Sequence, residues 1–528
     1  MIKYSFIILT LAMAMPAWAQ KADILIKNGK IIDGTGNSWY YGDVAIKKDR
    51  ILAMGHLDKV RARQVIDAKG QVISPGFIDV HTHIEGEERK TPTADNFIYD
   101  GVTTVITGNC GLSHSDTGKY FRFLDSLQLS VNVGTFIGHN AVRQAVMGTA
   151  NRRPTPQEQE KMEQLVSTAL QQGAMGFSTG LIYIPGTYSE TPEVVGLARA
   201  AARYRGVYTS HIRNETDKIF EAVEEAINIG RLTGMPVQIS HFKIGKPNWY
   251  RSSETLALVK KARQEGLDVS IDQYPYAASS TTLNSIVPAW ALENGPDSIK
   301  ARLHHPATRE KLKAEMIKDM VRRDRPDFSY AVVASFAANP AYNGKSITEI
   351  NQLLGREGNI PTEIETILDL TEQGSAAMVF HSMNEADVEN IMQYPFTMIA
   401  SDGGIRELGV GMPHPRGYGT NARVLGLYVR EKNILGLEDA IRRMTSLPAQ
   451  KFGLTNRGML KPGMKADVLV FDPARVKEMS TFEKPHAYSV GMDYVLVNGQ
   501  LTVAAGQHTR AREGEIIVGP GVKKKRRS

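Results

Sequence analysis

The sequence predicts an α/β protein built on a (β/α)₈ barrel with a small β-rich domain. The middle of the chain alternates short apolar runs with amphipathic helical stretches such as Gln157 to Gln172 and Asp217 to Thr233. This alternation is typical of parallel strands joined by crossover helices. Both ends of the chain carry strand patterns instead, which predicts a separate sheet domain.

The apolar runs are the expected barrel strands. There are nine of them, one more than a barrel needs. Their ends, in order, lie at His81/His83, Cys110, His139, Ser178/Thr179, His211, His241, Tyr274, Phe380/His381 and Asp402. Eight units close such a barrel, so one run must belong elsewhere. The polar, interrupted stretch at about 288–358 predicts an insertion over the barrel mouth.

The chain ends are expected to pair with each other. Residues 22–32 are predicted as two strands around Asn28-Gly29, and residues 494–503 repeat the pattern around Asn498-Gly499. Asn-Gly supplies the positive φ angles of a two-residue hairpin turn. Residues 465–472 add another strand. We therefore predict one small β-sandwich from residues 20–72 and 460–518, with the barrel occupying residues 73–459.

The first residues match a secretory signal peptide at positions 1–19. Lys3 provides the positive region, Phe6 to Met15 the apolar core, and Ala17-Trp18-Ala19 a small-x-small cleavage site. The apolar core is too short to span a bilayer. A retained membrane anchor is the alternative, but nothing like a stop-transfer segment follows, and no cysteine at the cleavage site offers a lipid anchor. The expected location is a bacterial periplasm.

Composition fits a large soluble enzyme. The chain has 528 residues, 42% of them hydrophobic, which is ample for a barrel core and an accessory domain. The formal net charge is +7, and the basic run Lys523 to Arg527 falls in a tail at residues 519–528. No interleaved aromatic and basic motif supports nucleic-acid binding, so we expect no nucleic-acid partner and assign the tail no function.

The single cysteine is the first indication of a metal site. Exported proteins usually carry cysteines in disulfide pairs, and one cysteine cannot form an internal bridge. A buried small hydrophobic residue is the ordinary interpretation of a lone cysteine. Cys110 lies between Gly108 and Gly111 at the end of a strand-like run, and this position favours a metal ligand.

The other candidate ligands also close apolar runs. His81 and His83 are two residues apart, so on a strand both point to one face. His211 or His241 alone would be an ordinary core histidine, and Asp402 alone a turn-starting aspartate. Catalytic groups of a barrel come from its C-terminal strand ends, so we expect all six in one site. Thiolate, imidazole and carboxylate are zinc ligands, and a catalytic zinc also activates water. We interpret His114, His139 and His381 as structural.

The order of these residues resembles the amidohydrolase superfamily, and more closely its D-aminoacylase (N-acyl-D-amino-acid deacylase) family. The closer resemblance rests on residues 108–111, 176–181, 240–243, 274–276 and 414–416, followed by Gly419-Thr420. It implies a tight zinc site on Cys110, His211 and His241. It also implies a second, weaker site on His81, His83 and Asp402, bridged by Cys110. Asp402 would then act as the general base and acid.

The resemblance also implies a clamp for the α-carboxylate of the substrate, made by Lys243, Tyr274, Ser280 and Arg416. The ordinary alternatives are a solvated Lys243, a Tyr274 packed beside Pro275, and an Arg416 in a loop ion pair. A guanidinium suits bidentate carboxylate recognition.

Three functions fit the sequence. The first is hydrolysis of N-acyl-D-amino acids, or of short peptides with a C-terminal D-residue. The second is a cyclic-amide hydrolase of the hydantoinase or dihydroorotase kind. Many binuclear relatives of that kind bridge their metals with a carboxylated lysine of the fourth strand, and residues 176–180 contain no lysine. The third is a non-catalytic binding barrel, which should have lost its ligands. The sequence makes no prediction of oligomeric state.

Overall fold

A closed barrel of parallel strands forms the centre of the computed structural model, which describes residues 21–522. The barrel strands are β6 (Phe77–Asp79), β7 (Val102–Thr107), β8 (Asn132–Thr135), β9 (Ile137–Gly138), β10 (Gly176–Gly180), β11 (Val207–His211), β12 (Val237–Ile239), β13 (Val269–Gln273) and β17 (Thr397–Ile399). β8 and β9 are one strand interrupted at Phe136, so eight strands surround the barrel axis. The predicted signal peptide and most of the basic tail lie outside the described residues.

The first and last strands close the barrel just beyond their C-terminal ends. The His83 N–H donates to the Gly403 carbonyl at 2.7 Å, and the Asp402 N–H donates to the His81 carbonyl at 2.9 Å. Thr82 forms a parallel bridge with Gly403. Two predicted ligand segments, one from each end of the barrel sequence, are thereby held side by side.

Burial explains why these runs become strands. Every residue of β7, β10 and β11 is buried, as expected for parallel strands covered on both faces.

The ninth run, β16 (Ala377–Phe380), pairs antiparallel with β14 (Ser279–Thr282) and β15 (Ala331–Ser335). The surplus strand candidate therefore belongs to the insertion and not to the barrel.

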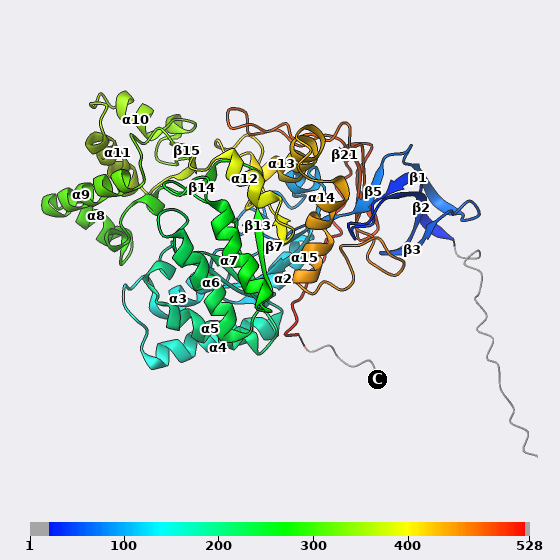
Figure 1. Cartoon of the computed structure of the whole chain (residues 1–528), viewed down its shortest axis with the longest axis horizontal. Coiled ribbons are helices and arrows are strands. Elements are labelled where there is room, and N and C mark those ends of the chain that lie inside the picture. Colours follow the sequence, from blue (N-terminus) through cyan, green and yellow to red (C-terminus); the bar gives the residue numbers. More distant parts are fainter. Residues whose placement is uncertain (1–20, 523–528) are drawn as a thin grey trace, which may run out of the picture.

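Helices cover the outside of the barrel, and several lie side by side at the lower left of Figure 1. They are α1 (Asp95–Ile98), α2 (Thr117–Leu127), α3 (His139–Met147), α4 (Pro156–Gln172), α5 (Thr191–Ala202), α6 (Ile219–Thr233), α7 (Ser252–Gln264), α12 (Glu385–Met392), α13 (Arg416–Arg423), a π-helix (Val424–Glu431), α14 (Leu437–Met444) and α15 (Ser446–Lys451). The helix α4 starts with a capping box between Thr155 and Glu158 and ends at Gly173, whose φ is 116°. Helices α4 and α6 match the two helical stretches predicted from the sequence.

The insertion is a unit with its own core, at the upper left of Figure 1. Its elements are β14, α8 (Pro296–His304), α9 (Pro306–Arg322), β15, α10 (Ile347–Leu353), α11 (Ile360–Glu372) and β16. Leu312, Met316, Ile364 and Ile367 are buried within it. β14 and β16 pair with each other and belong to this unit. The unit therefore begins before residue 288 and ends after residue 358, so it is longer than the insertion predicted at about 288–358.

The two ends of the chain meet in one nine-stranded sheet. Its strands are β1 (Ala22–Ile31), β2 (Tyr40–Lys47), β3 (Arg50–Gly55), β4 (Ala62–Asp67), β5 (Val72–Pro75), β18 (Val468–Phe471), β19 (Met492–Val497), β20 (Gln500–Ala504) and β21 (Gln507–His508). β5 pairs antiparallel with β18, which joins the N-terminal strands to the C-terminal ones. The description of this sheet as a sandwich stays a prediction.

The two Asn-Gly pairs have different structures. Asn498 and Gly499 both have positive φ, 48° and 80°, and they turn β19 into β20 as predicted. At the first pair only Asn28 has a positive φ, and β1 continues through Gly29 with a register shift against β2. The predicted hairpin there is wrong, because Asp43 accepts the Asn28 N–H at 2.9 Å and the local structure is a bulge.

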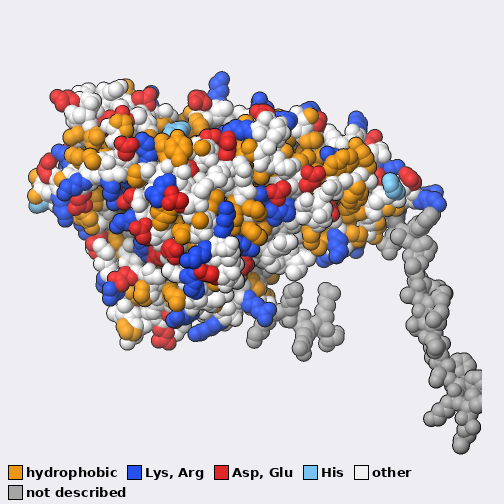
Figure 2. Space-filling model, viewed as in Figure 1, with side chains coloured by type: hydrophobic (Ala, Val, Ile, Leu, Met, Phe, Trp, Pro, Cys, Tyr) orange, Lys and Arg blue, Asp and Glu red, His pale blue; other side chains and the backbone are white. Residues whose placement is uncertain are grey.

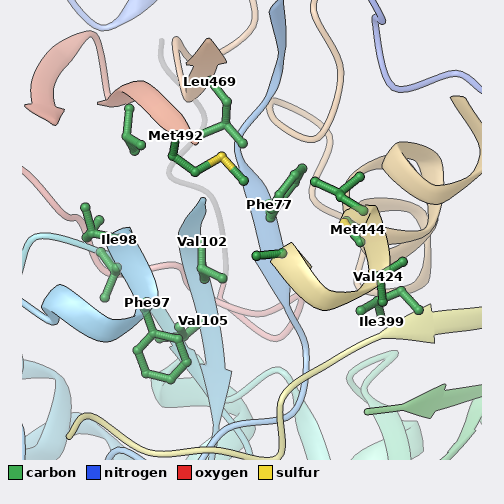
Figure 3. Packing of buried hydrophobic residues seen from close by; sticks show 14 of the residues in the cluster. Phe77, Phe97, Ile98, Val102, Val105, Ile399, Val424, Met444, Leu469 and Met492 are labelled. Carbon is green, nitrogen blue, oxygen red and sulfur yellow. The ribbon is translucent and has the colours of Figure 1, made fainter. Parts of the chain in front are cut away.

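Apolar packing joins the sheet of the chain ends to the barrel. Figure 3 shows Phe77 and Val102 of the barrel near Leu469 and Met492 of that sheet, with Val105 below them. All five side chains are buried. Burial of apolar surface contributes roughly 25 cal/mol per Å², so this core fixes the small sheet against the barrel strands that carry His81 and Cys110.

The outer surface carries mixed charge. Figure 2 shows Lys and Arg side chains interspersed with Asp and Glu over the face that it presents. None of the helices in the described part of the chain has the length and apolarity needed to cross a membrane.

Candidate metal centre and substrate cavity

The six predicted metal ligands converge at the C-terminal ends of the barrel strands. Cys110 is central: its Sγ lies 3.3 Å from His81 Nε2, 3.6 Å from His211 Nδ1 and 3.5 Å from His241 Nε2. Asp402 Oδ1 lies 3.1 Å from His83 Nε2 and 3.5 Å from His81 Nε2. The structure therefore brings together all six residues that the sequence predicted.

These separations fit zinc. Zinc–sulfur and zinc–nitrogen bonds of about 2.3 and 2.0–2.1 Å in a tetrahedron separate the sulfur and nitrogen atoms by about 3.5 Å. The Cys110–His211 and Cys110–His241 distances match this value. Cys110, His211 and His241 also form one of the groups whose donor atoms all lie within 4.8 Å of one another, and His81, His241 and Asp402 form another.

The backbone is turned sharply at three of the ligands. Cys110, His241 and Asp402 have φ of 53°, 35° and 50°, a left-handed conformation that is uncommon outside glycine. Such residues cost about 1–3 kcal/mol each and persist only where the surroundings fix them. Next to Cys110, a side chain at Gly108 would come within 2.6 Å of the Phe136 carbonyl, and one at Gly111 within 2.4 Å of Asn140. Both glycines therefore hold the Cys110 turn.

The charged groups of the centre shift one another's pKa values. Burial alone would raise the pKa of the Cys110 thiol, but the imidazoles of His81 and His241, together with hydrogen bonds from His211 and His241, hold that pKa well below its usual value. Burial alone would lower the pKa of His83, whereas its bonds to Asp402 and Cys110 raise it to about 9. A thiolate is the form of cysteine that binds a metal.

Asp272 orients two of the histidines, and the sequence reasoning missed it. Its Oδ1 lies 3.2 Å from the ring nitrogen Nδ1 of His81 and accepts the backbone N–H of His241 at 2.8 Å. Its other oxygen accepts a hydrogen bond from the Gln238 side chain. A carboxylate on the far nitrogen fixes the tautomer and ring orientation of a metal-binding histidine. The signal was present, because Asp272 is an acidic residue within the apolar run before Tyr274.

Glu215 plays a similar part for His241. Its Oε1 lies 3.1 Å from His241 Nδ1 and 2.6 Å from Lys243 Nζ. Burial alone would raise the Glu215 pKa, but Lys243 foremost, and then His211 and His241, hold it well below its usual value. Glu215 lies in an irregular segment after β11, where no periodicity could have indicated it.

A cavity of about 770 Å³ opens beside this centre. Its lining includes residues from the metal centre, the barrel loops and the insertion, namely His83, Glu85, Cys110, Leu112, Ile182, Tyr183, Ile184, Arg213, Glu215, Lys246, Ser280, Ile286, Val287, Leu292, Arg323, Arg325, Asp402, Arg406 and Arg416. The apolar residues of the lining come from the loops after β7 and β10 and from the insertion. The guanidinium groups of Arg406 and Arg416 come instead from the segment after β17.

Arg416 forms an ion pair with Asp402 and also lines the cavity. Its Nη1 lies 2.9 Å from Asp402 Oδ2, its Nη2 donates to the Ser280 carbonyl at 3.2 Å, and its Cζ lies 4.5 Å from the Tyr274 ring centroid. Burial alone would raise the pKa of Asp402, but Arg416 foremost, and then His81 and His241, hold it well below its usual value.

The four predicted carboxylate-binding residues lie together but point in different directions. Ser280 and Arg416 line the cavity. Lys243 and Tyr274 are not among its lining residues: the Lys243 ammonium is paired with Glu215, and the Tyr274 hydroxyl faces Met383 Sδ at 3.9 Å. The Lys243 ammonium and the Arg416 guanidinium both lie near the Tyr274 ring, with Lys243 Nζ 5.7 Å and Arg416 Cζ 4.5 Å from its centroid. Of the four predicted residues, Ser280 and Arg416 are the two that line the cavity.

The fold and the site define a barrel of the metal-dependent hydrolase class, and comparison with known proteins agrees. The model of the amidohydrolase family matches residues 64–503. The chain is 35% identical over 503 residues to an N-acyl-D-glutamate deacylase of Alcaligenes xylosoxydans xylosoxydans, covering 91% of this chain and 93% of the relative.

Two solved structures extend the comparison. One is an N-acyl-D-glutamate deacylase of Bordetella bronchiseptica complexed with zinc and a phosphonate inhibitor, with a TM-score of 0.80 and 35% identity, covering 95% of this chain and all of that one. The other is a D-aminoacylase described with a binuclear metal centre, in which one metal activates and the second attenuates. It has a TM-score of 0.80 and 34% identity, covering 94% of this chain and 100% of that one. The chain belongs to the amidohydrolase family and, within it, to the D-aminoacylase family.

Proposed function

We propose that this protein hydrolyses the amide bond of N-acyl-D-amino acids, or of short peptides with a C-terminal D-residue, with the help of zinc. The observation that carries this proposal is the Cys110–His211–His241 cluster beside the Asp402–Arg416 pair, at the edge of one cavity. The relatives named above, which act on N-acyl-D-amino acids, support the choice of a linear amide and of the D configuration.

Cys110, His211 and His241 would hold a tight zinc, and His81, His83 and Asp402 a weaker second one with Cys110 bridging. Bound zinc supplies an acidified water and polarises the scissile carbonyl. The distances around Cys110 and its lowered pKa support the first assignment. The partial exposure of His83, whose side chain is 28% accessible, supports a more easily exchanged second site.

Asp402 is suited to moving the proton. Its Oδ1 faces the histidines and its Oδ2 faces Arg416, so the carboxylate bridges the centre and the substrate cavity. The carboxylate would accept a proton from the attacking water and deliver it to the leaving amine. Its pKa, held well below the usual value by Arg416 and the histidines against the effect of burial, keeps the carboxylate ionised before the proton is transferred.

The cavity can hold the two ends of such a substrate apart. Arg416 and Ser280 would bind the α-carboxylate of the amino acid, with Lys243 and Tyr274 supporting them from behind. The apolar wall of Leu112, Ile182 and Ile184 would receive the acyl group. The free acid should then be preferred over its neutral amide, because the amide leaves charged donors unpaired.

We further propose that the protein is exported to a bacterial periplasm, and that the sheet of the chain ends forms a small β-sandwich beside the barrel. The first proposal rests on residues 1–19. The second rests on the apolar clusters that both faces of the sheet carry.

The test is a hydrolysis screen with purified, zinc-supplemented protein. Paired N-acetyl-D- and N-acetyl-L-amino acids, their α-amides, and L-Xaa-D-Xaa dipeptides would be compared by release of free amine. We expect turnover of D-configured acids, little of the L-enantiomers, and a large loss for the amides. Preferential cleavage of hydantoins or dihydropyrimidines in a parallel assay would contradict the proposal.

A further inference from the structure

The pair formed by Asp402 and Arg416 is joined by a long irregular loop. Residues 403–415 connect the two without a helix or a strand. Near the middle of this loop, Leu408 and Val410 are 54% and 57% exposed. A segment with an exposed middle and no regular structure does not fix the distance between its own ends. Other residues must therefore hold Arg416 against Asp402 at 2.9 Å.

Asn96 connects the two ends of this loop. Its Nδ2 donates to the Gly404 carbonyl at 3.0 Å and to the Gly417 carbonyl at 2.6 Å. Its Oδ1 accepts the Arg406 N–H at 3.2 Å. Gly404 comes two residues after the aspartate of the pair, and Gly417 directly follows the arginine. One side chain therefore sets the spacing between the two stretches of backbone that carry the pair.

The contact between the loop ends is closely packed. A Cβ atom on Gly403 would lie 3.1 Å from Gly417 Cα, and one on Gly404 would lie 2.5 Å from the His83 carbonyl. Asn96 is 0% exposed, and both donors and the acceptor oxygen of its amide are used. Removing the amide would take a buried hydrogen-bond partner from both ends of the loop at once.

Asn96 is itself a fixed point. It lies in α1, whose Phe97 and Ile98 belong to the same buried apolar cluster as Val102 and Val105 of the barrel strand β7. Figure 3 shows Phe97 beside Val105. The helix α1 is thus anchored to the barrel by its apolar side chains, and Asn96 passes that anchoring on to the loop.

The aspartate of the pair has an independent anchor. The Asp402 N–H donates to the His81 carbonyl at 2.9 Å, and Thr82 forms a parallel bridge with Gly403. Closure of the barrel therefore fixes Asp402 without help from Asn96. Loss of the Asn96 amide should consequently displace the arginine and not the aspartate.

The arginine lies in the first turn of α13, which is separated from the rest of that helix. The backbone of Gly419 is non-helical, with φ of −140° and ψ of 20°. Asp100 holds the part after this kink, because it accepts the backbone N–H groups of residues 421–422 at 2.7 and 3.0 Å. Before the kink, the bond from Asn96 to the Gly417 carbonyl ties the backbone to the barrel.

We propose that Asn96 is a positioning residue, which holds Arg416 in the contact with Asp402 on which hydrolysis depends. Asn96 is not among the residues that line the cavity, so it acts through the arginine and not on the substrate. This inference rests on the roles proposed above for Asp402 and Arg416. A misplacement of about 1 Å, caused by a residue remote from the chemistry, can cost about 10²-fold in rate.

The test is a double-mutant cycle between Asn96 and Arg416. kcat/KM for an N-acetyl-D-amino acid would be measured for the wild type, Asn96→Ala, Arg416→Met and the double variant, with zinc content and Tm recorded for each. Asn96→Ala should lower kcat/KM by about 10- to 100-fold and keep its zinc. In the Arg416→Met background the same change should cost less than about threefold, because the contact that Asn96 sets is already absent.

Asn351 provides a matched control. It is also 0% exposed, and its Nδ2 donates to the Glu357 carbonyl at 2.7 Å within the insertion. Its Oδ1 accepts the Thr366 hydroxyl at 2.9 Å. Asn351→Ala should lower Tm, because it also removes a buried amide, but should change kcat/KM by less than about threefold in both backgrounds.

Three results would overturn the assignment. The first is an equal loss of kcat/KM on Asn96→Ala in both backgrounds, which is the outcome for general damage to the fold. The second is normal turnover by Asn96→Ala with intact zinc. The third is loss of the tight zinc in Asn96→Ala, which would place its effect on the metal centre.

Two further measurements keep the cycle decisive. If Asn96→Ala does not fold, Asn96→Ser, whose hydroxyl can keep one of the bonds, takes its place. If the double variant is too slow to assay, the affinity of the four proteins for a phosphonate analogue of the substrate, measured by calorimetry, follows the same cycle. Failure of the proposed function is distinct, because the wild type itself would then hydrolyse no N-acetyl-D-amino acid, and the cycle would be run with the amide that it does hydrolyse.

Discussion

The metal centre has an inner and an outer half that differ in burial and in partners. The inner half is Cys110, His211 and His241, each no more than 3% exposed. The outer half is His83 and Asp402, whose side chains are 28% and 9% exposed. Cys110 lines the cavity as well, but it is more deeply buried than either. His81 contacts both halves. Enclosure favours a permanently held metal, whereas access to substrate and solvent favours proton transfer and exchange.

The largest expected effect comes from breaking the inner half at its centre. Cys110→Ala removes the atom that three histidines share. We expect the purified variant to lose most of its zinc and essentially all hydrolysis, because ligand loss removes metal binding directly. Elemental analysis gives the answer, and a full zinc complement in Cys110→Ala would contradict the division into halves.

A change in the outer half should separate chemistry from metal binding. Asp402→Asn keeps the size and most contacts of the side chain but removes the charge that Arg416 and His83 face. We expect the tight zinc to remain and kcat to fall by roughly 10²-fold or more, as for other general acid–base residues. Near-normal turnover of this variant would remove Asp402 from the mechanism.

A smaller effect is expected from a residue that hydrogen-bonds to the ligands but is not itself a predicted ligand. Asp272→Asn leaves the six ligands intact but weakens the groups that orient His81 and His241. Substitutions of this kind cost about 10- to 100-fold in metal affinity or activity. Competition with a zinc chelator would measure the affinity, with Asp268→Asn, whose carboxylate pairs with Arg263 and Lys451, as a control that should behave like the wild type.

The smallest effect should come from the exposed edge of the outer half. His83→Ala removes one ligand of the weaker site and leaves Cys110, His211 and His241 in place. We expect it to retain the tight zinc and more activity than Asp272→Asn. If His83→Ala instead lost its zinc as completely as Cys110→Ala, the inner and outer halves would not be separable.

The sequence predicted which residues converge at the candidate metal centre because of a property of the barrel. All C-terminal strand ends of a (β/α)₈ barrel meet at one face. Residues that close apolar runs, such as Cys110, His211 and Asp402, are therefore neighbours even though they are far apart along the chain. The same logic counted one strand too many, because β16 is as apolar as a barrel strand and only its antiparallel pairing with β14 reveals its place.

Groups outside the strand ends were less predictable. Glu215 and Asn96 belong to segments too short or too irregular for any periodicity, and their importance depends on which groups they contact. Backbone conformation also depends on neighbouring groups, as the two pairs Asn28-Gly29 and Asn498-Gly499 show. The dipeptide permits a hairpin, but Asp43 holds the Asn28 N–H and converts the first pair into a bulge.

Stepwise zinc addition to metal-free protein tests the central claim most directly. Protein freed of metal by a chelator would receive zinc in increments, with hydrolysis of an N-acetyl-D-amino acid followed at each step. If Cys110, His211 and His241 form one tight site, activity should be absent at first and reach its maximum at about one zinc per chain. Full activity in the metal-free protein, or none before a second equivalent is bound, would contradict that claim.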